Sequence, residues 1–141
     1  MKNLAKALLI LLAGCATAQA PKPARVEVPV EDRTQLQGTV YSVVNQQPYE
    51  YRFYDRNNDG TTDLMTVRPF QLIGGVRVMP ECPLGYIVDE NLNGVKDHEE
   101  FYIDDSCGDP QRLDDYVRGM TEQEMLDNPY LDWARENLYK R

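Results

Sequence analysis

Two segments of this chain repeat one pattern of oxygen-bearing side chains around a glycine, and the pattern restricts how the backbone can run there. Segments 55–63 and 89–97 both have the form D-x-N-x-[DN]-G-x-x-D. Asp or Asn at the first, third and fifth positions can supply several oxygens to one centre only if the backbone curls. Gly60 and Gly94 occupy the sixth position, where glycine permits the curl because it adopts positive φ.

The two loops therefore predict binding of Ca²⁺, one or two ions in all, since this cation takes six to eight oxygen ligands. They resemble the calcium loops of EF-hands, dockerins and the strand-loop-strand FG-GAP/VCBS repeats. The resemblance implies side-chain ligands, a backbone carbonyl at the seventh position (Thr61 and Val95), and a bidentate acid at the twelfth, Glu100. The implied ligands are Asp55, Asn57, Asp59, Thr61 and Asp63 in the first loop, and Asp89, Asn91, Asn93, Val95, Asp97 and Glu100 in the second.

The first loop departs from the EF-hand pattern, because Thr66 stands where the bidentate acid is expected. Water or a neighbour such as Glu50 would have to complete that site. The segments that enter the loops look extended, so the strand-loop-strand form fits better than helix-loop-helix, and a calmodulin-like switch fits poorly. Hairpin turns without an ion are the alternative interpretation. They explain the glycines and their neighbours, but not the matching acids at the loop ends.

The N-terminus has the features of an export signal, with Lys2 and Lys6 ahead of a short apolar run. Its end, Leu-Ala-Gly-Cys at 12–15, resembles the lipobox of bacterial lipoproteins. The resemblance implies a signal peptide at 1–14 and palmitate and other acyl chains on Cys15, which would anchor the protein in a membrane. Since Ala16 follows the cysteine, it also implies the outer membrane, with the domain facing the periplasm or the cell surface. An ordinary signal cleaved after Ala20 is the alternative.

Residues 15–34 contain prolines at 21, 23 and 29 and predict an extended tether. Twenty such residues would reach roughly 60 Å at about 3.1 Å each. The chain carries a net charge of -8, which becomes about -10 when Lys2 and Lys6 are removed. That acidity argues against a nucleic-acid partner, and it leaves membrane attachment to the acyl chains.

Cys82 and Cys107 are the two cysteines that remain after the lipobox, and in an exported chain they predict a disulfide. Cys82 lies seven residues before Asp89, and Cys107 lies seven residues after Glu100. If the flanks of the second loop run antiparallel, the two cysteines face each other. A redox pair and a thiolate metal site are the alternatives, and neither has a C-x-x-C spacing to support it.

Residues 35–141 predict one α+β domain, a small antiparallel sheet of hairpins that carries the two calcium loops, followed by short helices. Alternation in 49–54 places Tyr49 and Tyr51 on one face, with Glu50 and Arg52 on the other. Pro110 suggests the start of a helix, and Thr121 to Glu124 form a capping box. A last helix from Asn128 to Tyr139 is expected to bury Tyr130, Trp133, Ala134 and Leu138.

The favoured function is a non-catalytic calcium-binding envelope lipoprotein that presents a small binding or scaffolding domain to a protein or glycan. The alternative is an envelope enzyme or enzyme inhibitor whose working residues the sequence does not reveal. The chain has one histidine, His98. A zinc centre there is possible in principle, but a solvated loop side chain is the simpler interpretation, and no Ser/His/Asp set can be assembled around it.

Overall fold

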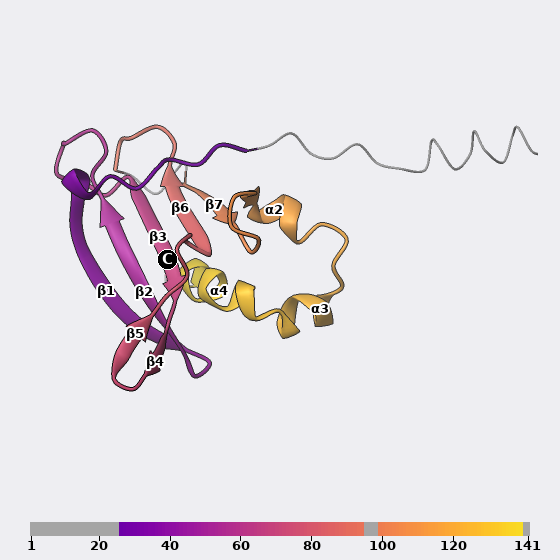
Figure 1. The fold of residues 1–141 in the computed structure, drawn as a ribbon. Coiled ribbons are helices and arrows are strands. Elements are labelled where there is room, and N and C mark those ends of the chain that lie inside the picture. Colours follow the sequence, from indigo (N-terminus) through magenta and orange to yellow (C-terminus); the bar gives the residue numbers. More distant parts are fainter. Residues whose placement is uncertain (1–25, 95–98, 140–141) are drawn as a thin grey trace, which may run out of the picture.

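The structure is a computed structural model, and it describes residues 26–94 and 99–139. Six strands form an antiparallel sheet in the order β1-β2-β3-β6-β7-β8, and β4 pairs with β5 in a separate hairpin (Figure 1). Short helices follow the strands, as expected for an α+β domain. The strands are β1 (Leu36–Val44), β2 (Gln47–Tyr54), β3 (Leu64–Pro69), β4 (Gln71–Ile73), β5 (Val76–Val78), β6 (Gly85–Asp89), β7 (Glu99–Ile103) and β8 (Gln111–Arg112). The helical segments are η1 (Arg33–Gln35), α2 (Leu113–Tyr116), α3 (Glu122–Asp127), η2 (Pro129–Leu131) and α4 (Asp132–Tyr139).

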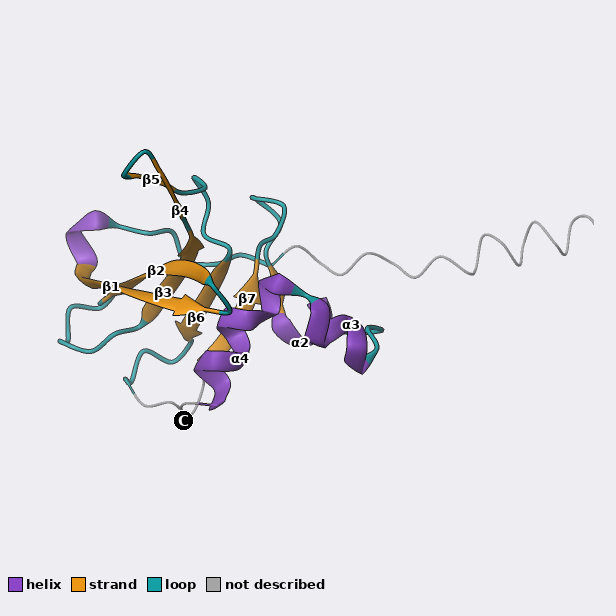
Figure 2. Ribbon diagram, turned by 90° about the horizontal axis from the view of Figure 1, so that it is seen from below, coloured by secondary structure: helices purple, strands orange, loops and turns teal. Residues whose placement is uncertain are grey.

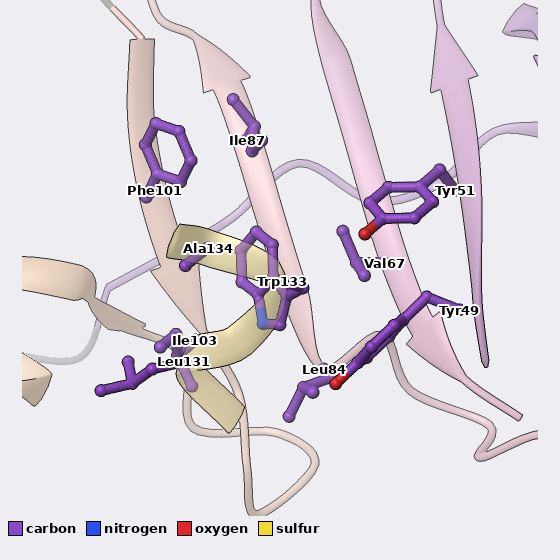
Figure 3. Packing of buried hydrophobic residues seen from close by; sticks show 10 residues of the cluster. All are labelled: Tyr49, Tyr51, Val67, Leu84, Ile87, Phe101, Ile103, Leu131, Trp133 and Ala134. Atoms are coloured by element: carbon purple, nitrogen blue, oxygen red, sulfur yellow. The ribbon is translucent and has the colours of Figure 1, made fainter. Parts of the chain in front are cut away.

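One face of the sheet carries the main hydrophobic core, and α4 packs on it (Figures 2 and 3). Tyr49 and Tyr51 point into this core from β2, as the alternation predicts. Trp133 of α4 lies at its centre, fully buried and stacked on Phe101 with ring centroids 6.3 Å apart. The other core residues are Val67, Leu84, Ile87, Ile103, Leu131 and Ala134.

The opposite face is covered by an N-terminal strap, residues 26–32, whose Val26 and Val28 pack on a second apolar cluster. That cluster comprises Tyr54, Leu64, Tyr86, Val88 and Tyr102. The strap belongs to the segment that its composition assigns to the tether. The described part of that segment thus lies against the domain. The β4–β5 hairpin also lies on the face opposite α4 (Figure 2).

Glu31 ties the strap to the sheet through a buried charge pair. Arg68 donates Nη1 to Glu31 Oε1 at 2.7 Å and Nη2 to Oε2 at 2.5 Å. Tyr54 Oη and Thr66 Oγ1 donate to Oε1 at 2.9 and 2.5 Å. Partial burial acts to raise the pKa of Glu31, but the hydrogen bonds from Arg68 and Thr66 and the charge of Arg68 outweigh it and lower the pKa to about 2.

A disulfide joins Cys82 and Cys107, as predicted, with a Cα–Cα distance of 5.5 Å. Its position follows from the antiparallel pairing of β6 with β7, in which Gly85 lies opposite Ile103. The chain beyond each strand end continues to a cysteine, so the bridge closes the two strands that flank the second loop.

In the C-terminal helices the predicted capping box is present, but the helix boundaries differ from those predicted. Thr121 forms the predicted capping box with Glu124. The expected helix after Pro110 is replaced by the short strand β8, and α2 begins at Leu113. Tyr130 is 42% exposed although it was expected to be buried, and Leu131 is buried in its place. The reason is the 3₁₀ turn η2, whose tighter winding changes which side chain faces the core.

Two further observations bear on the remaining expectations. The side chain of Leu138, expected in the core, lies outside the described side chains. Within the described residues, no helix combines the length and apolar character needed to cross a bilayer.

Candidate metal centre

The first loop leaves β2 and curls so that its backbone amides point at its own carboxylates. Asp55 Oδ1 accepts the amide of Asp59 at 3.1 Å, and Oδ2 accepts that of Gly60 at 2.7 Å. Positive φ values at Asn58 (60°) and Gly60 (89°) produce the curl. At the far end, Asp63 Oδ2 accepts the amide of Arg56 at 2.8 Å. The chain therefore folds around the acids that the pattern singles out.

Three of the predicted ligands converge in this loop. One carboxylate oxygen from each of Asp55, Asp59 and Asp63 lies within 4.8 Å of the other two. Asp59 Oδ1 also accepts the hydroxyl and amide of Thr61 at 2.6 and 2.9 Å. These hydrogen bonds, the hydroxyl first, lower the pKa of Asp59 and favour its charged form. The cluster is thus an acidic triad that could hold a metal ion.

Asp63 is the residue of the triad whose surroundings most favour a cation. It is only 1% exposed, and its Oδ1 has no hydrogen-bond partner among the described residues. A buried carboxylate oxygen without a partner costs free energy, because it has lost water and gained no compensating contact. A divalent cation beside Asp55 and Asp59 would supply that contact, so the donor set fits a hard cation.

The second loop repeats the backbone geometry of the first at the same positions. Leu92 has a φ of 56° and Gly94 one of 73°, which correspond to Asn58 and Gly60. The amide of Gly94 donates to Asp89 Oδ2 at 2.8 Å. Asp89 is 4% exposed, and its Oδ1 lacks a hydrogen-bond partner within the described part of the chain. The two loops therefore share a conformation as well as a residue pattern.

The remaining ligands of the second loop are only partly placed. Val95 and Asp97, together with His98, lie outside the described residues. The amide of Asn93 donates to Asn91 Oδ1 at 3.3 Å. Glu100 lies on β7 opposite Val88, with its carboxylate 3.8 Å from Arg112 Nη1. Of the six implied ligands, four thus lie in the described part of the chain: Asp89, Asn91, Asn93 and Glu100.

Thr66 and Glu50 do not belong to the first loop. Thr66 is fully buried in β3, and its hydroxyl donates to Glu31. Glu50 accepts Arg52 Nε at 2.5 Å and Arg77 Nη1 at 3.3 Å. The interpretation that Glu50 could complete the site is therefore wrong, since its carboxylate is held on the strap-covered face by two arginines.

The two loops leave the same end of the sheet and touch each other (Figure 1). Asn57 Nδ2 donates to the carbonyl of Leu92 at 3.1 Å. The amide of Asp89 donates to the carbonyl of Asp63 at 2.8 Å. This adjacency follows from the topology, because β2 and β6 both pair antiparallel with β3 and so run in the same direction.

Sequence reasoning did not single out Asp104, a third buried carboxylate at a strand end. Both of its oxygens accept the amide of Gly108, at 3.0 and 2.9 Å, and Oδ1 also accepts that of Asp109 at 3.2 Å. Positive φ at Cys107 and Gly108 forms the turn. The sequence signal for this turn is an acid, Asp104, followed four residues later by Gly108, which comes directly after Cys107.

No family model, curated protein or solved structure matches the chain.

Proposed function

We propose that this chain is an exported, lipid-anchored protein without catalytic activity that binds Ca²⁺ through loop 55–63 and presents a small domain at the bacterial envelope. The observation that carries the metal proposal is the convergence of Asp55, Asp59 and Asp63, with the buried Asp63 Oδ1 lacking a hydrogen bond within the described residues. A second ion in loop 89–100 is part of the proposal.

Calcium suits this loop because the available donors are oxygens with three formal negative charges. Asn57 Oδ1 and the carbonyl of Thr61 would join the carboxylates, with water completing the shell. Modules of exported proteins with such donors bind at roughly 10⁻⁴–10⁻³ M, which suits millimolar surroundings. The ion would offset the mutual repulsion of the three acids and hold β2 against β3, which is a structural role.

The lipid anchor is supported by the Leu-Ala-Gly-Cys sequence that ends at Cys15 and by the disulfide, which is typical of oxidising compartments. Cys15 itself lies outside the described residues. Incorporation of labelled palmitate into the wild-type chain, and its loss in Cys15→Ser, tests the anchor. An unlabelled wild-type chain would contradict the anchor and leave the calcium proposal untouched.

Isothermal titration of the chelator-treated chain with Ca²⁺ tests the metal proposal, alongside a thermal melt. We expect binding, a higher melting temperature with Ca²⁺, and an affinity weaker by about tenfold in Asp59→Asn, which removes one ligand charge. Asp59 is exposed, so the substitution preserves the fold. The matched control is Asp114→Asn, an exposed acid on α2 with the same charge change. Absence of heat and of a melting shift would overturn the proposal.

A further inference from the structure

Arginines gather on one side of an otherwise acidic molecule. Four of them line a single pocket of about 410 Å³. The residues that line the pocket come from the strap, η1, β2, β3, β5 and the segment after β5. The arginines are Arg33, Arg52, Arg68 and Arg77, whereas the other described ones, Arg56, Arg112, Arg118 and Arg135, do not line it.

The balance of charge in this pocket is opposite to that of the chain. Glu31 and Glu81 also line the pocket, and Glu50 forms ion pairs with Arg52 and Arg77. Four positive charges thus meet three negative ones, in a chain whose net charge is -8. A local excess of positive charge in an acidic chain favours the attraction of anions to the pocket.

Glu31 already shows what the pocket does with an oxyanion. Its two oxygens sit on the two terminal nitrogens of Arg68, in the paired geometry that guanidinium groups form with carboxylates and phosphates. Arg68 is only 6% exposed, and its charge is already neutralised by Glu31. A ligand in the pocket would therefore bind the more exposed arginines.

Donors remain on the other arginines. Arg33 is exposed, and its guanidinium forms no ion pair with any described residue. Arg77 uses Nη1 for Tyr41 Oη and Glu50, while its guanidinium lies 4.1 Å from the centre of the Tyr41 ring. A guanidinium carries five N–H donors, so these contacts leave part of Arg77 available. Stacking on Tyr41 also holds Arg77 in place, which lowers the entropy cost of binding.

We propose that this pocket is a binding site for an organic oxyanion, a phosphate monoester or carboxylate, held by Arg33 and Arg77. Its volume exceeds what a bare phosphate needs and falls within the range of small-molecule sites. Tyr54, Met79 and Pro80 supply a less polar surface for the body of the ligand. The site is separate from the acidic loops and does not depend on Ca²⁺.

The test uses the full chain in EGTA, so that complexes of calcium with phosphate are not counted as binding. Isothermal titration compares glucose 6-phosphate and glucuronate with neutral glucose. Co-sedimentation with vesicles that contain phosphatidic acid, whose headgroup is a phosphate monoester, compared with phosphatidylcholine vesicles, tests a lipid phosphate as the source of the same group. Arg33→Ala is the variant, because this exposed side chain supports no described contact. Arg118→Ala, an exposed arginine on the helical side, is the control with the same charge change.

We expect saturable binding of a charged probe, no binding of glucose, and an affinity about tenfold weaker in Arg33→Ala, the loss of one charge-assisted hydrogen bond. Arg118→Ala should bind like the wild type, and both variants should melt like it. Binding of the soluble probes assigns a soluble ligand, and binding confined to phosphatidic acid vesicles assigns a lipid headgroup. The proposal fails if no anionic probe or vesicle binds, or if both variants lose binding equally.

Discussion

Gly85 of β6 lies directly beneath the indole of Trp133, so close that a β-carbon built on Gly85 would stand 2.0 Å from Trp133 Cζ2. Two other ring atoms would lie within 2.6 Å of it. The absence of a side chain on Gly85 is what allows the fully buried Trp133 to lie there.

Gly85→Ala should therefore destabilise the domain by roughly 3 kcal/mol, because the ring would have to leave its place in a close-packed core. Urea unfolding followed by the fluorescence of Trp133, the chain's one tryptophan, measures the loss. The matched control is Gly38→Ala, where a β-carbon meets nothing within 4 Å. If the two variants lose the same stability, helix α4 does not pack as described.

Glu31→Gln should cost roughly 2–4 kcal/mol at neutral pH, since it breaks the pair with the buried Arg68. The wild-type advantage should depend on pH in a defined direction. The pKa of Glu31 falls from 4.5 to about 2 on folding, so its contribution is complete above 4.5 and disappears as the pH drops toward 2. Urea unfolding of both chains at pH 7, 4 and 2.5 should show the gap narrowing. A constant gap would contradict the charged pair.

Loss of the disulfide should destabilise the protein by about 3.5 kcal/mol, the loop-closure value for cysteines 25 residues apart. The double variant Cys82→Ser/Cys107→Ser should unfold at lower urea than the oxidised wild type. A reductant should lower the wild-type midpoint to nearly that of the variant and leave the variant unchanged. An insensitive wild type would mean that the bridge does not form.

Thr121→Ala should lower stability by about 1 kcal/mol, because it removes the side chain that caps the first turn of α3. Thr121→Ser keeps the hydroxyl and should restore most of the loss. Thermal unfolding of the three chains tests this. Equal losses for alanine and serine would show that the methyl group, rather than the capping hydrogen bond, is what matters there.

The features that the sequence predicted are those whose causes are local. Alternation placed Tyr49 and Glu50 on opposite faces because successive strand residues must point opposite ways. The capping box at Thr121 needs only its own four residues, and the spacing of Asp55, Asp59 and Asp63 brings them together through one curl of the backbone.

The features that could not be predicted from the sequence depend on residues that are far apart in the chain. Glu31 stands in a proline-containing segment that has the composition of a linker, and its partner Arg68 lies 37 residues away. No local signal joins the two. Thr66 occupies the loop position where an acid is expected, but the pairing of β3 buries it beneath the strap, where it hydrogen-bonds to Glu31. The arginine pocket likewise assembles from η1, β2, β3 and β5, which only the folded topology brings together.

The strap has a mechanical consequence. It precedes η1 and β1, so tension applied from the N-terminal side of Val26 acts on Glu31 before it acts on any strand. The packing of Val26 and Val28, followed by the bond between Glu31 and Arg68, would yield first, and the segment would detach while the six strands stayed paired. Force applied to this end of the molecule would thus expose Arg68 and the second apolar cluster before the sheet unfolded.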